Sequence, residues 1–106
     1  GSVASHNVYP NTSVYCATKH AVKVFSKALR LELGGKVKGT MISPGPVDTP
    51  FVEGLITAEN KEEVTAYFSS GLAPNDVAEA IAYAVNQPPK VAINEVIIRP
   101  NNPPAR

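Results

Sequence analysis

Cysteine is nearly absent from this sequence, since Cys16 is the only one in 106 residues. A single cysteine excludes an internal disulfide bond, which fits a reducing compartment, and we therefore expect a cytoplasmic protein. Long hydrophobic runs are also absent: none approaches the roughly 18 residues of a membrane-spanning helix. No stretch has the pattern of a signal peptide either. These absences predict a protein without a membrane partner.

An excess of charge of one sign is missing as well. The formal net charge is +1, and the 10 lysine and arginine residues are scattered along the chain. Nothing resembles the basic stripe of a nucleic-acid-binding protein, and no cysteine and histidine cluster has the spacing of metal ligands. The hydrophobic share of 43%, against 18% charged residues, instead indicates a globular chain of one domain's length.

What the sequence does contain is a tyrosine and a lysine four residues apart, Tyr15 and Lys19, near the start of a predicted helix. The helix is predicted over residues 14–33, because apolar residues recur there with a period close to 3.6 and Gly34-Gly35 ends it. Both side chains should therefore project from the same face. An ammonium beside a phenol favours the phenolate, which suits Tyr15 for proton exchange. The same spacing also occurs on ordinary solvent-exposed helical surfaces.

The rest of the chain alternates strands and helices. A strand is predicted over residues 37–43, ended by Ser43-Pro44-Gly45-Pro46, because proline cannot continue a ladder. Helices are predicted over residues 61–68 and 74–86, and a second strand over residues 91–99. Its unbroken Val-Ile-Ile run suits a strand covered on both faces, as in a parallel sheet. This order predicts an α/β fold and completes a βαβ unit whose first strand is not in the sequence.

At this point the chain resembles the short-chain dehydrogenase/reductase family. Four segments carry the resemblance, and they occur in the family's order. They are Gly1-Ser2-Val3-Ala4, with Ser2 thirteen residues before Tyr15; Tyr15-x-x-x-Lys19; Pro44-Gly45-Pro46-Val47-Asp48-Thr49; and Leu72-Ala73-Pro74-Asn75-Asp76-Val77-Ala78, followed by the strand at 93–98. A Gly-Ser pair in first position is also typical of a cloning remnant, and the alternative for Ser2 is such a remnant or an ordinary turn serine.

The resemblance implies a fold and a domain organisation. It covers only the C-terminal half of a family domain, so residues 1–106 are expected to form a single partial domain. The implied fold is the C-terminal part of a Rossmann-type doubly wound parallel sheet, in the order helix-strand-helix-strand, without its N-terminal half. The family's glycine-rich phosphate loop and its ribose-reading residue are missing. The full-length protein is expected to be a homodimer or a homotetramer.

The resemblance also implies a reaction and its residues. The family's oxidoreductases transfer a hydride between NADP or NAD and a small carbonyl or alcohol substrate. Tyr15 would be the general acid–base that exchanges a proton with the substrate oxygen. Lys19 would support the tyrosine and hydrogen-bond the nicotinamide ribose, and Ser2 would bind the substrate oxygen. Ser2, Tyr15 and Lys19 are thus the expected catalytic residues, and no metal is expected.

The cofactor loop is expected to follow the first predicted strand. Pro44, Gly45, Val47 and Thr49 would face the nicotinamide carboxamide, with contacts from the Val47 backbone and the Thr49 hydroxyl. The alternative is a proline-rich turn that only ends a strand. Its place at the carboxyl end of a strand in an α/β sheet favours a ligand.

Weaker candidates and a second function remain open. His6 is a candidate for the substrate pocket, His20 and Cys16 are expected to have no role in the reaction, and residues 51–68 are a candidate lid. The alternative function is a catalytically silent fragment that acts only as a packing or dimerisation module. The apolar stripe from Ala17 to Leu31 would serve core and interface together in that case.

Overall fold

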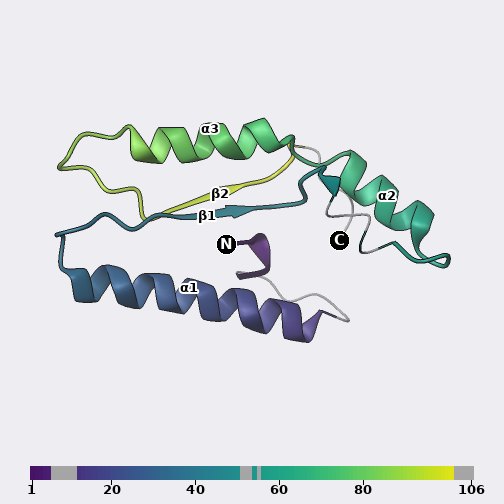
Figure 1. Ribbon diagram of the computed structural model, residues 1–106, viewed down its shortest axis with the longest axis horizontal. Coiled ribbons are helices and arrows are strands. Elements are labelled where there is room, and N and C mark those ends of the chain that lie inside the picture. The colour runs from purple at the N-terminus through teal and green to yellow at the C-terminus, as the bar shows by residue number, and fades with distance from the viewer. Residues whose placement is uncertain (6–11, 51–53, 55, 102–106) are drawn as a thin grey trace.

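The computed structural model describes residues 1–5, 12–50, 54 and 56–101. Its elements are helices and two short strands (Figure 1). In chain order they are the 3-10 helix η1 (Val3–Ser5), α1 (Ser13–Leu33), β1 (Met41–Pro44), α2 (Lys61–Ser69), α3 (Pro74–Val85) and β2 (Glu95–Ile98).

The described strands form a parallel pair between two layers of helix. β1 pairs with β2 in the register Met41↔Glu95 to Pro44↔Ile98. Figure 1 shows α1 on one side of this pair and α3 on the other, with η1 between α1 and β1. Helices on both faces of a parallel sheet define the doubly wound α/β class, so the predicted fold class is confirmed as a partial domain.

The helices begin and end where their local sequence predicts. α1 ends at Gly34, whose φ of +58° lies in the left-handed region that favours glycine. α3 begins with Pro74 in its first turn, and the Asp76 carboxylate accepts the Ala73 N–H at 2.9 Å. Local capping chemistry is enough to place these boundaries within a residue or two.

Both strands are shorter than predicted, which corrects the ranges 37–43 and 91–99. The ladder begins at Met41, and before it Thr40 Oγ1 only donates a side-chain bond to Ile93 O at 2.6 Å. Pro44, expected to lie beyond the strand, is its last residue. The N–H groups of Met41 and Gly45 point to β2, so position 44 faces the opposite edge and needs no N–H for this pairing.

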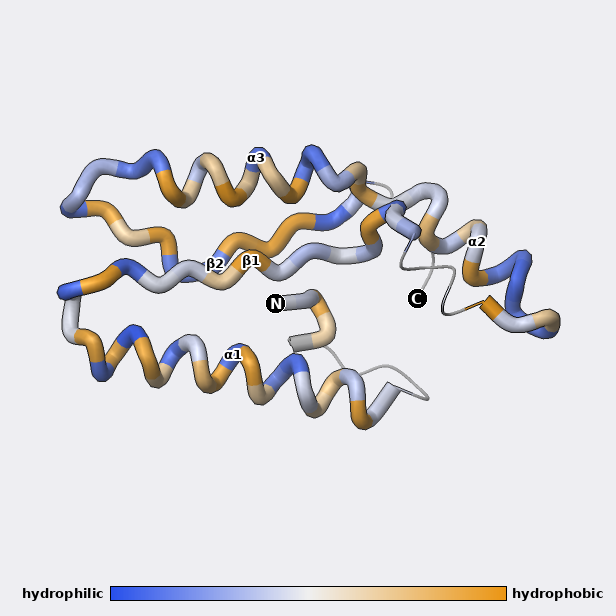
Figure 2. The backbone as a smooth tube through the Cα atoms, viewed as in Figure 1, coloured by the Kyte–Doolittle hydropathy of each residue, from blue (hydrophilic) through white to orange (hydrophobic). Residues whose placement is uncertain are grey.

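The predicted apolar stripe of α1 is not part of the core, which corrects its assignment as core. The buried hydrophobic residues among those described are Ala4, Cys16, Met41 and Ala84. Hydrophobic residues occur along the whole of α1 (Figure 2), yet Val24, Phe25 and Leu31 are 65–71% exposed. Ile97 is also exposed, so β2 is not covered on both faces as its sequence predicted.

None of the helices in the described part of the chain combines the length and the apolar character that crossing a membrane requires.

Candidate active site

The first turns of α1 and the segment before η1 bring two hydroxyl groups together. Tyr15 OH donates to Ser2 Oγ at 3.4 Å, and Ser2 Oγ also accepts the Ala4 N–H at 3.1 Å. Ser2 is buried, whereas Tyr15 is 48% exposed. An O–H···O distance of 3.4 Å exceeds the usual 2.5–3.0 Å, so the bond is weak. The pair therefore combines a fixed serine with a tyrosine that is open to a ligand.

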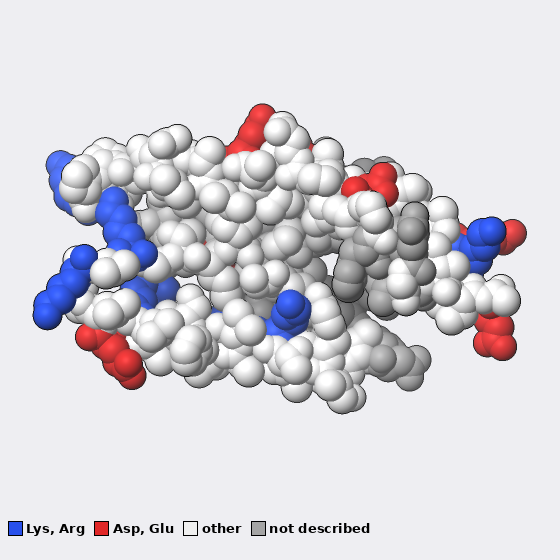
Figure 3. Space-filling view, viewed as in Figure 1, with Lys and Arg blue, Asp and Glu red and all other residues white. Residues whose placement is uncertain are grey.

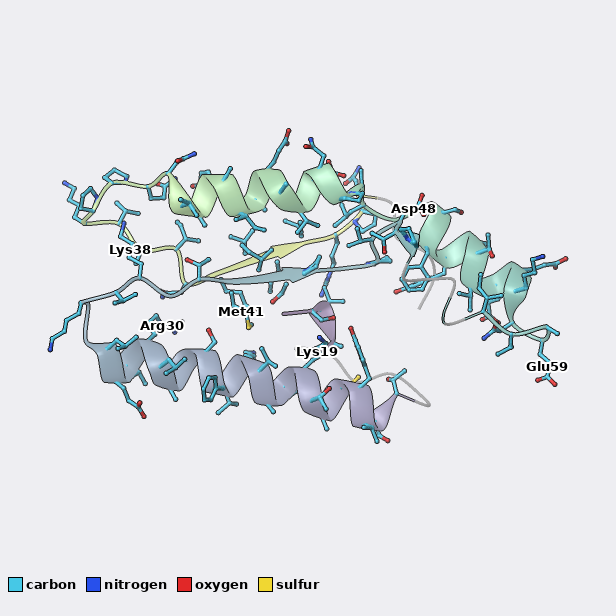
Figure 4. The ribbon with its side chains drawn as sticks, in the orientation of Figure 1. Lys19, Arg30, Lys38, Met41, Asp48 and Glu59 are labelled. Carbon is cyan, nitrogen blue, oxygen red and sulfur yellow. The ribbon has the colours of Figure 1, made fainter. Side chains whose placement is uncertain are left out.

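Lys19 lies on the same face of α1 as Tyr15, as the spacing predicts. Its Nζ lies 5.4 Å from the centroid of the Tyr15 ring, within the range of a cation–π contact. Figure 4 shows Lys19 extending from α1 toward η1 and the strands. The Lys19 ammonium therefore places a positive charge next to the phenol of Tyr15.

The predicted cofactor loop follows β1 and is held from two sides. Gly45 N–H donates to Ile98 O at 2.7 Å, which continues the pairing with β2. Further on, Leu72 N–H donates to Pro46 O at 2.8 Å and Asp48 N–H donates to Leu72 O at 2.8 Å. These bonds form a parallel bridge between Val47 and Leu72. The loop is thus a fixed extension of the sheet.

The bridge also decides how Val47 is oriented. In a parallel bridge, the residues that flank Val47 supply both hydrogen bonds to Leu72. The N–H and C=O of Val47 itself therefore point to the opposite side of the loop. Gly71 allows this approach, because a Cβ there would lie 2.6 Å from Pro46 O. The Val47 N–H can donate to the oxygen of a carboxamide, and the Val47 C=O can accept from its NH2 group.

The two predicted groups of site residues lie away from the end of the molecule where α1 finishes. Figure 1 shows η1 near the middle of the view, with the first turns of α1 and the loop after β1 to its right. On the face drawn in Figure 3, basic side chains gather mainly at the other end, where α1 finishes. The described residues contain no group of three or more histidine, cysteine or acidic residues that could hold a metal ion.

A polar pair with one completely buried member, Ser43, was not predicted from the sequence. Ser43 is completely buried, and its Oγ donates to Glu95 Oε2 at 2.8 Å. Ser43 and Met41 alternate on the strand, and Met41 lines a small cavity with residues of α1, so both face α1. A serine on the inward face of a strand indicates a buried hydroxyl that needs a partner. The sequence could not identify that partner, because Glu95 lies 52 residues later.

The weaker candidates have local roles or lie outside the described residues. His20 Nδ1 lies 2.6 Å from Cys16 O one turn earlier, so its ring contacts its own helix and not the Ser2–Tyr15 pair. Cys16 is buried, as expected, with its Sγ 3.2 Å from Thr12 Oγ1. His6 and much of the start of the predicted lid lie outside the described residues.

Comparison with known proteins agrees with this arrangement. The family described as short chain dehydrogenase matches residues 1–60, and the chain belongs to this family. A curated relative is an uncharacterised oxidoreductase of Staphylococcus saprophyticus, 36% identical over 104 residues. That match covers 95% of this chain and 42% of the relative. Another uncharacterised oxidoreductase, from Listeria monocytogenes, is 33% identical, and the match covers 97% of this chain and 43% of the relative. The chain thus spans less than half the length of these relatives.

Solved structures show the same fold at similar coverage. A closed form of serine dehydrogenase complexed with NADP+ superposes with a TM-score of 0.79 at 34% identity. The superposition covers 94% of this chain and 42% of the serine dehydrogenase chain. Serine dehydrogenase from Escherichia coli gives a TM-score of 0.71, also at 34% identity, over 94% of this chain and 37% of its own. An alcohol dehydrogenase from Thermococcus sibiricus, complexed with 5-hydroxy-NADP, gives 0.74 at 26% identity, over 99% and 42% of the two chains.

Proposed function

We propose that this chain is the C-terminal part of an oxidoreductase domain that interconverts a small carbonyl compound and an alcohol. Residues 1–106 would form one partial domain, and the longer protein that contains it is called the complete enzyme below. The coverage of about two fifths of each relative supports this, because the matched part carries the Ser2–Tyr15–Lys19 group. The complete enzyme would act in the cytoplasm as a homodimer or a homotetramer.

The observation that carries the proposal is the weak bond between two hydroxyl groups at Ser2 and Tyr15. Their oxygens are 3.4 Å apart, so an oxygen placed between them can lie at an ordinary hydrogen-bond distance from both. Long contacts of this kind are common in catalytic groups that tighten only around a substrate. The Tyr15 hydroxyl would donate its proton to a substrate carbonyl oxygen. The Ser2 hydroxyl would stabilise the charge that develops on the same oxygen.

Lys19 would assist Tyr15 through its charge. The ammonium lies over the tyrosine ring at 5.4 Å, and its attraction for the phenol increases as the phenol gives up its proton. The side chain is also long enough to reach beyond the ring. We propose that it hydrogen-bonds the ribose next to the nicotinamide, which would orient the cofactor above the same pair of hydroxyl groups.

The loop after β1 fits a nicotinamide cofactor, either NADP or NAD. A bound nicotinamide supplies or accepts the hydride at the substrate carbon. Pro44 and Gly45 would bring the backbone close to it, the Val47 N–H and C=O would bind its carboxamide, and the Thr49 hydroxyl would add a further bond. The orientation of Val47 away from Leu72 supports this, as does the similar structure complexed with NADP+.

Tyr15→Phe in the complete enzyme tests the proposal. Removing the proton donor should lower kcat by a factor of about 10² to 10⁴, with the affinity for NADP(H) or NAD(H) nearly unchanged. The matched control is Tyr83→Phe, because Tyr83 is an exposed tyrosine on α3. Steady-state kinetics and cofactor fluorescence titration measure both quantities. A near-normal rate in the Tyr15 variant would contradict its role as the acid–base.

A second candidate function is a packing or dimerisation module without catalysis. The exposed Val24, Phe25 and Leu31 on α1 favour it, because an apolar helix face of this kind suits a protein partner. Isothermal titration of the 106-residue chain with NAD(H) and NADP(H) bears on this choice. We expect no micromolar binding, since the sequence has no glycine-rich phosphate loop. Size-exclusion chromatography of the same chain should show association, and a well-folded monomer would count against this candidate.

A further inference from the structure

The Ser43–Glu95 pair lies directly beneath the residue that precedes Ser2. Ser43 is completely buried and donates to Glu95 Oε2, so its hydroxyl is held in one orientation. A Cβ built on Gly1 would lie 2.7 Å from Ser43 Oγ and 2.8 Å from Ile42 O. Gly1 therefore rests on the Ser43 hydroxyl with no room for a methyl group between them. The position of Gly1 depends on where that hydroxyl points.

Glu95 holds the Ser43 hydroxyl from the neighbouring strand. It stands opposite Met41 in the β1–β2 register, two positions before Ile97, which is the direct partner of Ser43. Its carboxylate thus reaches diagonally across the pair on the side that faces α1. Glu95 also lines the small cavity between α1 and the strands, together with Met41 and Lys23. The acid is therefore an internal support and is not part of the Ser2–Tyr15 pair.

We propose that Glu95 is a positioning residue for the reaction, which acts through Ser43 and Gly1 to fix the Ser2 hydroxyl opposite Tyr15. This inference rests on the proposed function, because it assigns a further residue to the same site. The chain of contacts runs from Glu95 Oε2 to Ser43 Oγ, from there to Gly1, and through the peptide bond to Ser2. Ser2 Oγ then meets Tyr15 OH. Small displacements at a reacting group have large effects on rate.

Without the carboxylate, the buried Ser43 hydroxyl must find another acceptor. Ser43 is completely buried and its Oγ lies close to Gly1, so we expect a change in the Ser43 side-chain rotamer to displace Gly1. Glu95→Ala in the complete enzyme should therefore lower kcat by about 10- to 100-fold, with little change in the KM for the cofactor. Glu95→Gln retains an acceptor oxygen for Ser43 and should restore most of kcat. Glu79→Ala, on the exposed side of α3, is the matched control.

A double-variant cycle with Ser2→Ala separates positioning from general loss of structure. If Glu95 acts through Ser2, Glu95→Ala should have almost no further effect on kcat once the Ser2 hydroxyl is gone. Equal fold losses of kcat with and without the Ser2 hydroxyl would overturn the proposal. If Glu95→Ala does not fold, Ser43→Ala replaces it in the double-variant cycle with Ser2→Ala, because Ser43→Ala removes the hydroxyl that donates to Glu95.

A measurement without turnover distinguishes failure of this inference from failure of the proposed function. 3-Fluorotyrosine incorporated at position 15 of the complete enzyme reports the surroundings of the phenol by fluorine NMR. Glu95→Ala and Ser43→Ala should shift its signal, and Glu95→Gln and Glu79→Ala should not. An unchanged signal in Glu95→Ala overturns the positioning role even if the enzyme is active. A shifted signal in a protein without dehydrogenase activity supports the contact chain and refutes only the reaction.

Discussion

The two halves of helix α1 differ in what covers them. The first half packs against η1, buries Cys16 and brings Tyr15 within 3.4 Å of Ser2. The second half carries Val24, Phe25 and Leu31 largely in solvent. Both halves have similar apolar content in sequence, so the helix pattern alone does not separate them. The Ser2–Tyr15 contact thus lies where the chain supplies its own packing partner for α1.

In the second half, Lys23, Ser26 and Arg30 line the cavity against the strands, but Val24, Phe25 and Leu31 have no such cover among the described residues. In α/β domains an apolar helix face is covered by a neighbouring helix, a sheet or another subunit. The chain spans less than half of its relatives, so part of this cover would come from the rest of the complete enzyme. We therefore expect substitutions in the first half to affect rate and those in the second half to affect assembly.

The largest expected effect beyond that of Tyr15 is in the first half, at Lys19. Lys19→Met in the complete enzyme removes the ammonium over the Tyr15 ring but keeps most of the side-chain volume. It should lower kcat by about 10²-fold, because charge assistance to proton transfer is lost. Lys27→Met is the control, two helical turns further along α1. Similar rates in the two variants would break the distinction between the halves.

A smaller effect, on assembly rather than rate, is expected in the second half at Phe25. Phe25→Lys should weaken self-association of the complete enzyme by about 30-fold, the typical loss at an aromatic contact in an interface. The free energy of unfolding of the protomer should change by less than about 0.5 kcal/mol, because the ring is exposed. Sedimentation equilibrium measures the association constant, and Phe25→Leu is the control. An unchanged constant would exclude this face from the interface.

The smallest effect is expected where α1 ends. Gly34→Ala places a side chain at a φ of +58° and should lower the free energy of unfolding by about 1 kcal/mol. Gly39→Ala is the matched control, because a Cβ there meets open space and its φ is not positive. Urea unfolding of the complete enzyme measures both. Equal stability of the two variants would show that the left-handed turn does not determine where the second half stops.

Much of the site was predictable because its signals are local. Tyr15 and Lys19 share a face through helical periodicity, and Pro44–Gly45 marks the end of a strand through backbone chemistry. The strand lengths were not predictable, because Val37 has high β-propensity but no ladder partner. The Ser43–Glu95 pair could not be predicted either, since the two residues meet only when β1 and β2 align.

The sequence by itself determined the helices, their ends, and the shared face of Tyr15 and Lys19. Periodicity, capping and turn chemistry act over a few residues, so they can be recognised in the sequence without knowledge of the tertiary structure. Only the tertiary structure decided which apolar residues are buried, how long the strands are and what supports Ser2. Those properties depend on contacts between segments far apart in the chain, and such contacts form only when β1, β2, α1 and the residues before Tyr15 come together.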